Sequence, residues 1–337
     1  MNLPMAPLPT AQPLLALEDI PALQEEVRQL ARQRDAVILA HNYQVPEVQD
    51  VADYVGDSLG LSQQAAKATE SVIAFCGVHF MAETASILCP EKTVLIPDLD
   101  AGCSLAASIT ADELRTWQES HPGALTVMYV NTTAEIKALT DYCVTSSNAV
   151  AVVEHIYATH GDDTDILFGP DMFLGAYVEK MTGRPMHVWN GECHVHAGIR
   201  PRDIAEVRAA HPGADFLIHP ECGCSTSVME YVAAGDVDPQ GVHMLSTGGM
   251  LKYARDHAGQ GGTVVMATET GMLHGLRKAA PDLDFVAANE AASCRYMKMI
   301  TLPKLRDCLR DGLYGVKVPE EIAERARIPI ERMVAIS

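Results

Sequence analysis

An eight-residue stretch, WNGECHVH at residues 189–196, gathers a thiol, two imidazoles and a carboxylate directly after a short apolar run. A strand that ends in a glycine turn would direct these side chains into a cleft. Three interpretations fit the stretch alone. It could bind iron or an iron–sulfur cluster, form a zinc site from Cys193, His194 and His196, or bury an inert thiol among core histidines.

The chain around this stretch repeats one pattern three times. The tetrapeptide HPGA occurs at residues 121–124 and 211–214, each time after an expected helix and before an apolar run that predicts a strand. A capping box at residues 110–113 (TADE) predicts the start of the first of these helices. The two strands end at Tyr129 and His219, as the apolar run at residues 36–40 ends at His41. Such self-similarity indicates an internal repeat.

Each copy continues through a junction rich in glycine and small hydroxyl residues, then a strand and a helix, and then a fourth strand that is followed by a cysteine. These cysteines are Cys103, Cys193 and Cys294, at similar intervals after His41, Tyr129 and His219. The three thiols therefore occupy equivalent places in the three copies.

Strands that alternate with helices predict parallel sheets with right-handed crossovers, which is an α/β fold class. We expect an N-terminal arm and helix (residues 1–34), three α/β/α repeats (35–124, 125–214 and 215–300) related by pseudo-threefold symmetry, and a C-terminal helical tail (301–337). In the tail we expect a helix over residues 320–326 and a separate segment over 329–336. Because ligands bind beyond the carboxyl ends of parallel strands, the active site is expected at the central junction of the repeats.

Three thiolates that converge from three repeats suit a 4Fe–4S cluster with one iron left without a protein ligand, and such an iron is a Lewis acid. The chain has nine cysteines and no CxxC pair, which excludes zinc-ribbon and ferredoxin-type spacings. The other six are expected to be core residues (Cys76, Cys89, Cys143 and Cys308) or spare thiols, with a redox role as the alternative (Cys222 and Cys224).

The polar residues at the expected sheet edges would surround such a cluster: His41, Tyr43, Ser58, Tyr129, Asn131, Ser146, His219, Glu221 and Thr247. None is Arg or Lys, so hydroxyls, imidazoles and helix N-termini would hold substrate carboxylates or phosphate. Glu221, beside His219 and near Tyr43, would move protons alpha to a carbonyl. Taken singly, Ser58, Ser146 and Thr247 also fit helix N-caps, but their equivalence across the copies favours ligand binding.

Several ordered motifs together resemble the quinolinate synthase family, from about Val37 to Met333. They are AHNY at 40–43, GDSL at 56–59, GVHFMAET at 77–84, YVNTTAE at 129–135, VTSSNA at 144–149, HPEC at 219–222 and STGGM at 246–250. Some members of that family carry further cysteines in a CxxCxxC run before the third ligand. Here Ala291, Ala292 and Ser293 stand in that region, so a disulfide switch built on that run is not expected.

The resemblance implies an oxygen-sensitive 4Fe–4S cluster held by Cys103, Cys193 and Cys294. It implies the condensation of iminoaspartate with dihydroxyacetone phosphate to quinolinate, with release of phosphate and water, as a step towards NAD. An L-aspartate oxidase would then supply the imine. By the same resemblance Tyr43, Glu221 and His219 are catalytic, and the substrate pocket is formed by His41, Ser58, Tyr129, Asn131, Ser146, His219, Glu221 and Thr247.

Three other functions compete with this one. A zinc-dependent hydrolase would use Cys193, His194 and His196. A non-enzymatic iron–sulfur carrier or sensor would need a fourth protein ligand, and a structural solenoid would need no polar strand ends. The hydroxyl-rich motifs argue against the carrier or sensor, and the different polar ends of the three copies argue against the solenoid.

The overall composition narrows the classes of partner. The formal net charge of −19 argues against nucleic acids and anionic membranes, because both require basic surfaces. No apolar run approaches the roughly 20 residues of a membrane span. Residues 1–17 contain no basic residue and therefore do not predict a secretion signal. We expect a cytoplasmic protein.

Overall fold

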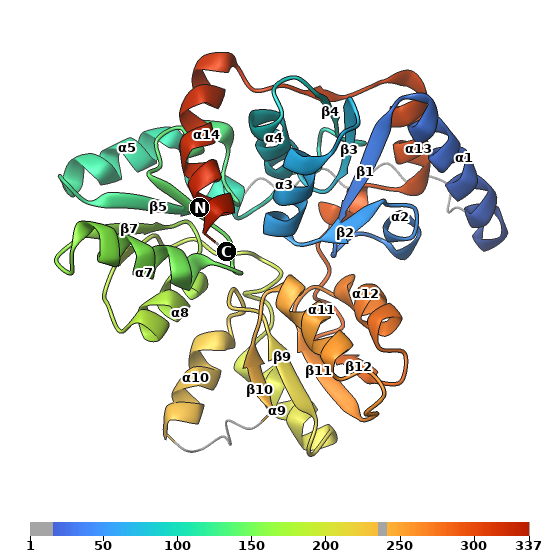
Figure 1. Ribbon diagram of the computed structural model, residues 1–337. Coiled ribbons are helices and arrows are strands. Elements are labelled where there is room, and N and C mark those ends of the chain that lie inside the picture. Colours follow the sequence, from blue (N-terminus) through green and yellow to red (C-terminus); the bar gives the residue numbers. More distant parts are fainter. Residues whose placement is uncertain (1–15, 235–240, 337) are drawn as a thin grey trace.

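The structure is a computed structural model that describes residues 16–234 and 241–336 (Figure 1). Most of the expected N-terminal arm lies outside the described residues. A 3-10 turn (η1, Leu17–Asp19) leads into α1 (Ile20–Gln33), which buries Leu23, Val27 and Ala31 along one face. This confirms the helix expected there.

Three sheets contain the strands of the three expected repeats. The first has β1 (Ala36–His41), β2 (Tyr54–Gly56), β3 (Val72–Cys76) and β4 (Thr93–Leu95). The second has β5 (Leu125–Tyr129), β6 (Tyr142–Val144), β7 (Ile166–Gly169) and β8 (His187–Val188). The third has β9 (Asp215–Ile218), β10 (Val242–Met244), β11 (Thr263–Ala267) and β12 (Asp284–Ala287).

The connecting helices complete three lobes, which Figure 1 shows in blue, green and orange. The first lobe has α2 (Pro46–Gln49), α3 (Ser58–Lys67) and α4 (His79–Leu88). The second has α5 (Ala111–Ser120), α6 (Ala134–Lys137), α7 (Ala149–His160) and α8 (Met172–Thr182). The third has α9 (Pro201–Ala210), α10 (Ser225–Ala234), α11 (Thr247–Asp256) and α12 (Met272–Ala279).

The three sheets share one strand order, β2-β1-β3-β4, β6-β5-β7-β8 and β10-β9-β11-β12, and all these neighbours pair in parallel. All six residues of β1 are buried, as expected for a parallel strand covered on both faces. The α/β class predicted from the sequence is confirmed.

The recurring HPGA tetrapeptide is a turn between a helix and the first strand of a sheet. Its glycines, Gly123 and Gly213, have φ angles of +92° and +84°, which side chains other than glycine rarely adopt. The alanine that follows each glycine donates its N–H to the histidine carbonyl at 3.2 Å. The helix before the first HPGA begins with the expected capping box, in which Thr110 Oγ1 accepts the N–H of Glu113 at 3.2 Å.

The C-terminal tail differs from the expectation in two ways. It contains α13 (Leu302–Asp311), a short strand β13 (Gly315–Val316) that pairs antiparallel with β4, and α14 (Glu320–Ala335). We expected a helix ending at residue 326, yet α14 continues through Pro329. An interior proline costs a helix about 3 kcal/mol. Burial of Ala326, Ile330 and Met333, on a helix that packs against α4, α6 and β6, offsets that cost.

Candidate active site

One cavity brings the predicted site residues together. It encloses about 700 Å³, including its opening to solvent, and its walls come from all three lobes. Its lining includes every site residue that the sequence predicts: His41, Tyr43, Ser58, Cys103, Tyr129, Asn131, Ser146, Cys193, His219, Glu221, Thr247 and Cys294.

The three cysteines occupy equivalent positions in the backbone. In each lobe, the carbonyl two residues before the cysteine accepts an N–H from a residue at or just before the start of the preceding helix. The pairs are His79 to Ala101 (2.7 Å), Met172 to Gly191 (2.8 Å) and Thr270 to Ala292 (2.8 Å). Each cysteine carbonyl then accepts the N–H four residues later, from Ala107 (3.1 Å), Ala197 (2.8 Å) and Lys298 (3.1 Å). The fold therefore directs three similar turns at one cavity.

The donor set of these thiols fits an iron–sulfur cluster. Burial raises the pKa of Cys103 to about 12 and also raises the pKa of Cys193 and Cys294, so bound metal is needed to make them thiolates. Their sulfurs are not among the ligand trios that lie within 4.8 Å in the described residues. A cluster does not require the sulfurs to share one ion, because each thiolate binds its own iron.

The zinc site proposed from Cys193, His194 and His196 is wrong. His194 Nδ1 lies 2.6 Å from Ser104 Oγ, whereas the imidazole of His196 lies against Glu221. Within the described residues, the trio close enough to hold a single ion is His196, His219 and Glu221. Adjacent residues on this turn face different neighbours, so the spacing of cysteine and histidine in the sequence does not make a metal site.

A buried carboxylate lies between two imidazoles in one wall of the cavity. Glu221 Oε2 is 3.0 Å from His196 Nδ1 and 3.4 Å from His219 Nδ1, and all three side chains are nearly inaccessible to solvent. The two imidazoles stack with 4.8 Å between ring centroids. Ser146 Oγ lies 3.2 Å from His219 Nε2, and Tyr43 Oη lies 3.2 Å from His196 Nε2. Tyr43, His196 and Glu221 therefore form a continuous chain of polar contacts.

The protonation states in this wall follow from burial and from these contacts. Burial lowers the pKa of His41 and His219 to about 3, so both imidazoles are neutral near pH 7. Burial alone would raise the pKa of Glu221, but its interactions with His196, His219 and the Tyr129 phenol outweigh burial and lower it to about 2. The carboxylate is ionised, and its Oε1 has no hydrogen-bond partner in the described part of the chain.

Acidification is expected to destabilise the protein below about pH 6.5. The unfolded chain binds protons at His41 and His219 near pH 6.5, whereas the folded protein takes them only near pH 3. Glu221 acts in the same direction between about pH 4.5 and pH 2. These groups therefore stabilise the fold fully at pH 7 and progressively less as the pH falls. Urea unfolding should show a free energy of unfolding at least about 2 kcal/mol lower at pH 5 than at pH 7.

A His41→Gln variant serves as the comparison for this pH effect. Glutamine has no proton to gain, so the fall in unfolding free energy between pH 7 and pH 5 should be smaller than in the wild-type protein. An equal fall in both proteins would contradict the assignment of this effect to His41.

The hydroxyl residues of the cavity are not helix caps, which corrects the alternative drawn from the sequence. The neighbouring residues cap instead: Asp57 accepts the N–H of Gly60 at the start of α3, and Ser246 accepts that of Gly249 at the start of α11. The hydroxyl of Thr247 accepts a hydrogen bond from Asn42 Nδ2 at 3.0 Å. Ser58, Ser146 and Thr247 are thus available to a ligand.

Several residues of the site were not predicted from the sequence. His196 was considered only as a zinc ligand, and Thr268 and Glu269 were not considered at all. A signal for Glu269 was available, since it follows the third strand of its repeat at the place where Asp171 stands in the second repeat.

The cysteines expected in the core are there. Cys76, Cys89, Cys143 and Cys308 are each at most 2% exposed, and so are Cys222 and Cys224. Burial raises the pKa of Cys222 well above the ordinary thiol value. The redox alternative for Cys222 and Cys224 stays a prediction.

The three sheets share one order of parallel strands, and each lobe brings a thiol and polar residues from its strand ends to a shared cavity. This arrangement defines an α/β enzyme built from three repeats. The family model described as Quinolinate synthetase A protein matches residues 25–335. The quinolinate synthase of Mycobacterium sp. (strain KMS) is 58% identical over 92% of this chain and 91% of its own length. Those of Mycobacterium tuberculosis (strain ATCC 25618 / H37Rv) and Mycobacterium leprae (strain Br4923) are 57% and 56% identical over 92% of this chain, covering 88% and 87% of their lengths. The chain belongs to the quinolinate synthase family.

Proposed function

We propose that this protein condenses iminoaspartate with dihydroxyacetone phosphate to give quinolinate, phosphate and water, in a pathway to NAD, and that it depends on a 4Fe–4S cluster. The observation that carries the proposal is that three equivalent turns present Cys103, Cys193 and Cys294 to one cavity with the polar residues predicted for the substrate. Membership of the quinolinate synthase family supports it. The proposal includes a pseudo-threefold arrangement of the repeats around this central site.

The three cysteines would hold the cluster, which supplies an iron with an open position as a Lewis acid for substrate nitrogen and carboxylate. Among the described residues no Arg or Lys lines the cavity, so substrate anions must be held by neutral donors. Ser58 and Thr247 are the first residues of α3 and α11, where the helix N-termini add partial positive charge. Together with Ser146 and Asn131 they form the proposed anion-binding wall.

The chain of polar contacts from Glu221 to Tyr43 suits proton transfer. His196 lies between ionised Glu221 and the Tyr43 hydroxyl, which is the order of groups in an acid–histidine pair of hydrolases. Burial raises the pKa of Tyr43 well above its usual range, so Tyr43 stays protonated and can donate to a leaving oxygen. Neutral His219 lies against Glu221 and Ser146 and belongs to the same proposed catalytic set.

Anaerobic purification and a quinolinate assay test this proposal. The protein should be brown and contain about four irons and four sulfides per chain. It should form quinolinate when L-aspartate oxidase generates the imine in the assay, and only when dihydroxyacetone phosphate is added. Protein that holds zinc in place of iron, or that holds the full cluster and forms no quinolinate, would contradict the proposal.

The remaining expectations concern partners, location and domain limits. Among the described residues no helix combines the length and apolarity that crossing a bilayer requires. A cytoplasmic location, supply of the imine by an L-aspartate oxidase, and the repeat limits 35–124, 125–214 and 215–300 belong to the proposal. These limits divide the chain at the first strand of each sheet, although α5 and α9 pack on the sheet that follows them. With a net charge of −19, the chain is not expected to bind nucleic acids or anionic membranes.

A further inference from the structure

We infer that Glu269 and Lys298 form a positioning pair, which fixes the Cys294 turn and ties it to the backbone of Tyr43. The pair deepens the proposed function and rests on it, because the benefit of fixing Cys294 is that a cluster binds there. Neither residue was predicted from the sequence, and neither is assigned a role in catalysis here.

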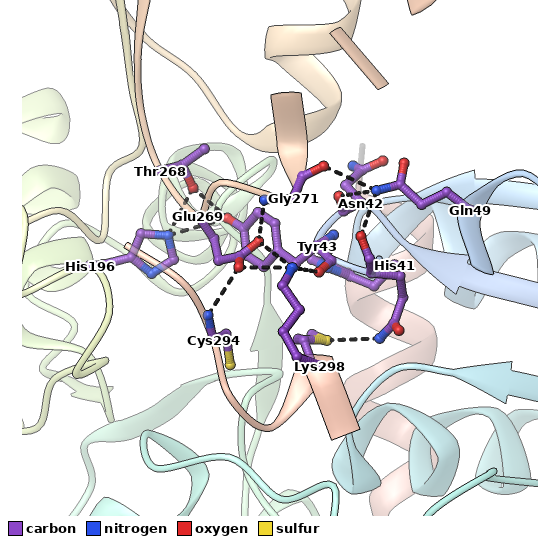
Figure 2. Close-up of polar contacts among 12 residues, drawn as sticks. His41, Asn42, Tyr43, Gln49, His196, Thr268, Glu269, Gly271, Cys294 and Lys298 are labelled. Carbon is purple, nitrogen blue, oxygen red and sulfur yellow. Dashed lines mark hydrogen bonds and ion pairs between the residues drawn. The ribbon is translucent and has the colours of Figure 1, made fainter. Parts of the chain in front are cut away.

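The Glu269 carboxylate is saturated by groups of the Cys294 turn and its surroundings. Its side chain is fully buried. Oε1 accepts the backbone N–H of Cys294 at 3.0 Å and lies 2.9 Å from Lys298 Nζ, while Oε2 accepts the N–H of Gly271 at 2.8 Å (Figure 2). A buried carboxylate with these partners fixes the direction in which the Cys294 backbone enters the cavity. Hydrogen bonds of this kind, one shell behind the metal ligands, commonly set metal affinity.

Lys298 connects the same turn to the first lobe. It lies four residues after Cys294, and its backbone N–H donates to the Cys294 carbonyl at 3.1 Å. Its Nζ also donates to the carbonyl of Tyr43, as Figure 2 shows. At the other end of that tyrosine, the hydroxyl lies 2.6 Å from Thr268 Oγ1. The adjacent residues Thr268 and Glu269 therefore both act on Tyr43. Thr268 contacts its hydroxyl directly, and Glu269 acts on its backbone carbonyl through Lys298.

The backbone of Gly271 packs closely against Lys298, Tyr43 and Glu269. A Cβ at Gly271 would lie 2.6 Å from Lys298 Nζ, 2.7 Å from the Tyr43 carbonyl oxygen and 2.8 Å from Glu269 Oε2. The Gly271 carbonyl accepts a hydrogen bond from Gln49 Nε2 at 3.0 Å. The loop of the first lobe and the Cys294 turn are thus held against each other at one crossing point.

The equivalent places in the other lobes lack such a pair. Strand register makes Cys76, Gly169 and Ala267 equivalent, so Val78, Asp171 and Glu269 each follow the third strand by two residues. Val78 has no charge, and Oδ1 of Asp171 caps α8 at Leu174 at 2.7 Å. Of these places, only that of Glu269 has a lysine partner in the described part of the chain. Asp171 is also fully buried and has no lysine partner in the described residues, whereas Lys298 balances the buried charge of Glu269.

The test compares Glu269→Gln and Lys298→Met with a matched control in the full-length, anaerobically purified protein. The control is Asp141→Asn, because Asp141 Oδ2 also accepts a backbone N–H, that of Thr126 at 2.8 Å, but at the amino end of β5, away from the cavity. The measurement is the rate at which a chelator removes iron near neutral pH. Both pair variants should lose iron about tenfold faster than the wild type, and Asp141→Asn within about twofold of it.

Steady-state kinetics separate positioning from general stability. Because Tyr43 is fixed through Lys298, both pair variants should show a kcat about tenfold lower with KM changed by less than about threefold. The double variant should lose iron no faster than Glu269→Gln alone, since the two residues act as a unit. The Lys298 side chain is one-quarter exposed, whereas that of Glu269 is fully buried, so Lys298→Met is expected to disturb folding less. It therefore tests the pair even if Glu269→Gln does not fold.

Iron loss from both pair variants at the rate of Asp141→Asn would overturn the inference while leaving the proposed function intact. A wild-type protein that holds no iron would refute the proposed function itself, and the inference with it. The two failures are therefore distinguishable in one set of purifications.

Discussion

Replacing Cys193 with alanine is expected to remove most of the iron from the protein and to abolish quinolinate formation. Three protein thiolates are the smallest set that holds a 4Fe–4S cluster with one open iron, and two would leave two irons without protein ligands. The variant should still fold, because the turn is held by backbone bonds that alanine keeps, including the Ala197 N–H to the residue 193 carbonyl at 2.8 Å. Iron and sulfide counts after anaerobic purification should fall from about four per chain to less than about one.

Cys308→Ala is the matched control for this experiment. Cys308 is a buried thiol in α13, its Sγ lies 3.3 Å from the Leu313 carbonyl, and it does not line the cavity. Its replacement should cost some stability through lost packing but leave the iron content unchanged. An unchanged iron content in Cys193→Ala would show that Cys193 is not a cluster ligand.

The fold was predictable from the sequence where a local rule acts. Apolar runs of about five residues predicted the buried strands, and the repeated HPGA turn marked where two of them begin. The glycine of that turn must adopt a positive φ, which explains why the tetrapeptide recurs without change. The position of each closing cysteine relative to these strands was then enough to place three thiols at one cavity.

The features that the sequence did not predict depend on contacts between segments that are distant in the chain. The continuation of α14 through Pro329 is a tertiary effect, because packing against α4, α6 and β6 outweighs a local rule. The contact of Lys298 with Tyr43 joins residues that are 255 positions apart, which no motif records. His196 was assigned to zinc because its neighbours in sequence are Cys193 and His194, whereas its neighbours in space are Glu221 and Tyr43.

Glu221→Gln is expected to lower kcat by about 10²–10⁴ while leaving the iron content unchanged. Glutamine is nearly isosteric but uncharged, so it cannot support His196 in returning to Tyr43 the proton that Tyr43 gives to the leaving oxygen. The loss should appear equally in kcat and kcat/KM, because the charge acts on proton transfer rather than on binding. Because the pKa of Glu221 is about 2, protonation of this carboxyl group should cause no fall in the wild-type kcat above about pH 4.

Glu113→Gln provides the control, since Glu113 belongs to the capping box of α5 and glutamine serves in that place as well. Its kcat should stay within about twofold of the wild type. A double variant of Glu221→Gln with His196→Gln tests whether the two residues act together. If they form one relay, the double variant should be only slightly slower than the slower single variant. Losses that multiply would mean that Glu221 acts on the substrate independently of His196, and that the relay to Tyr43 is wrong.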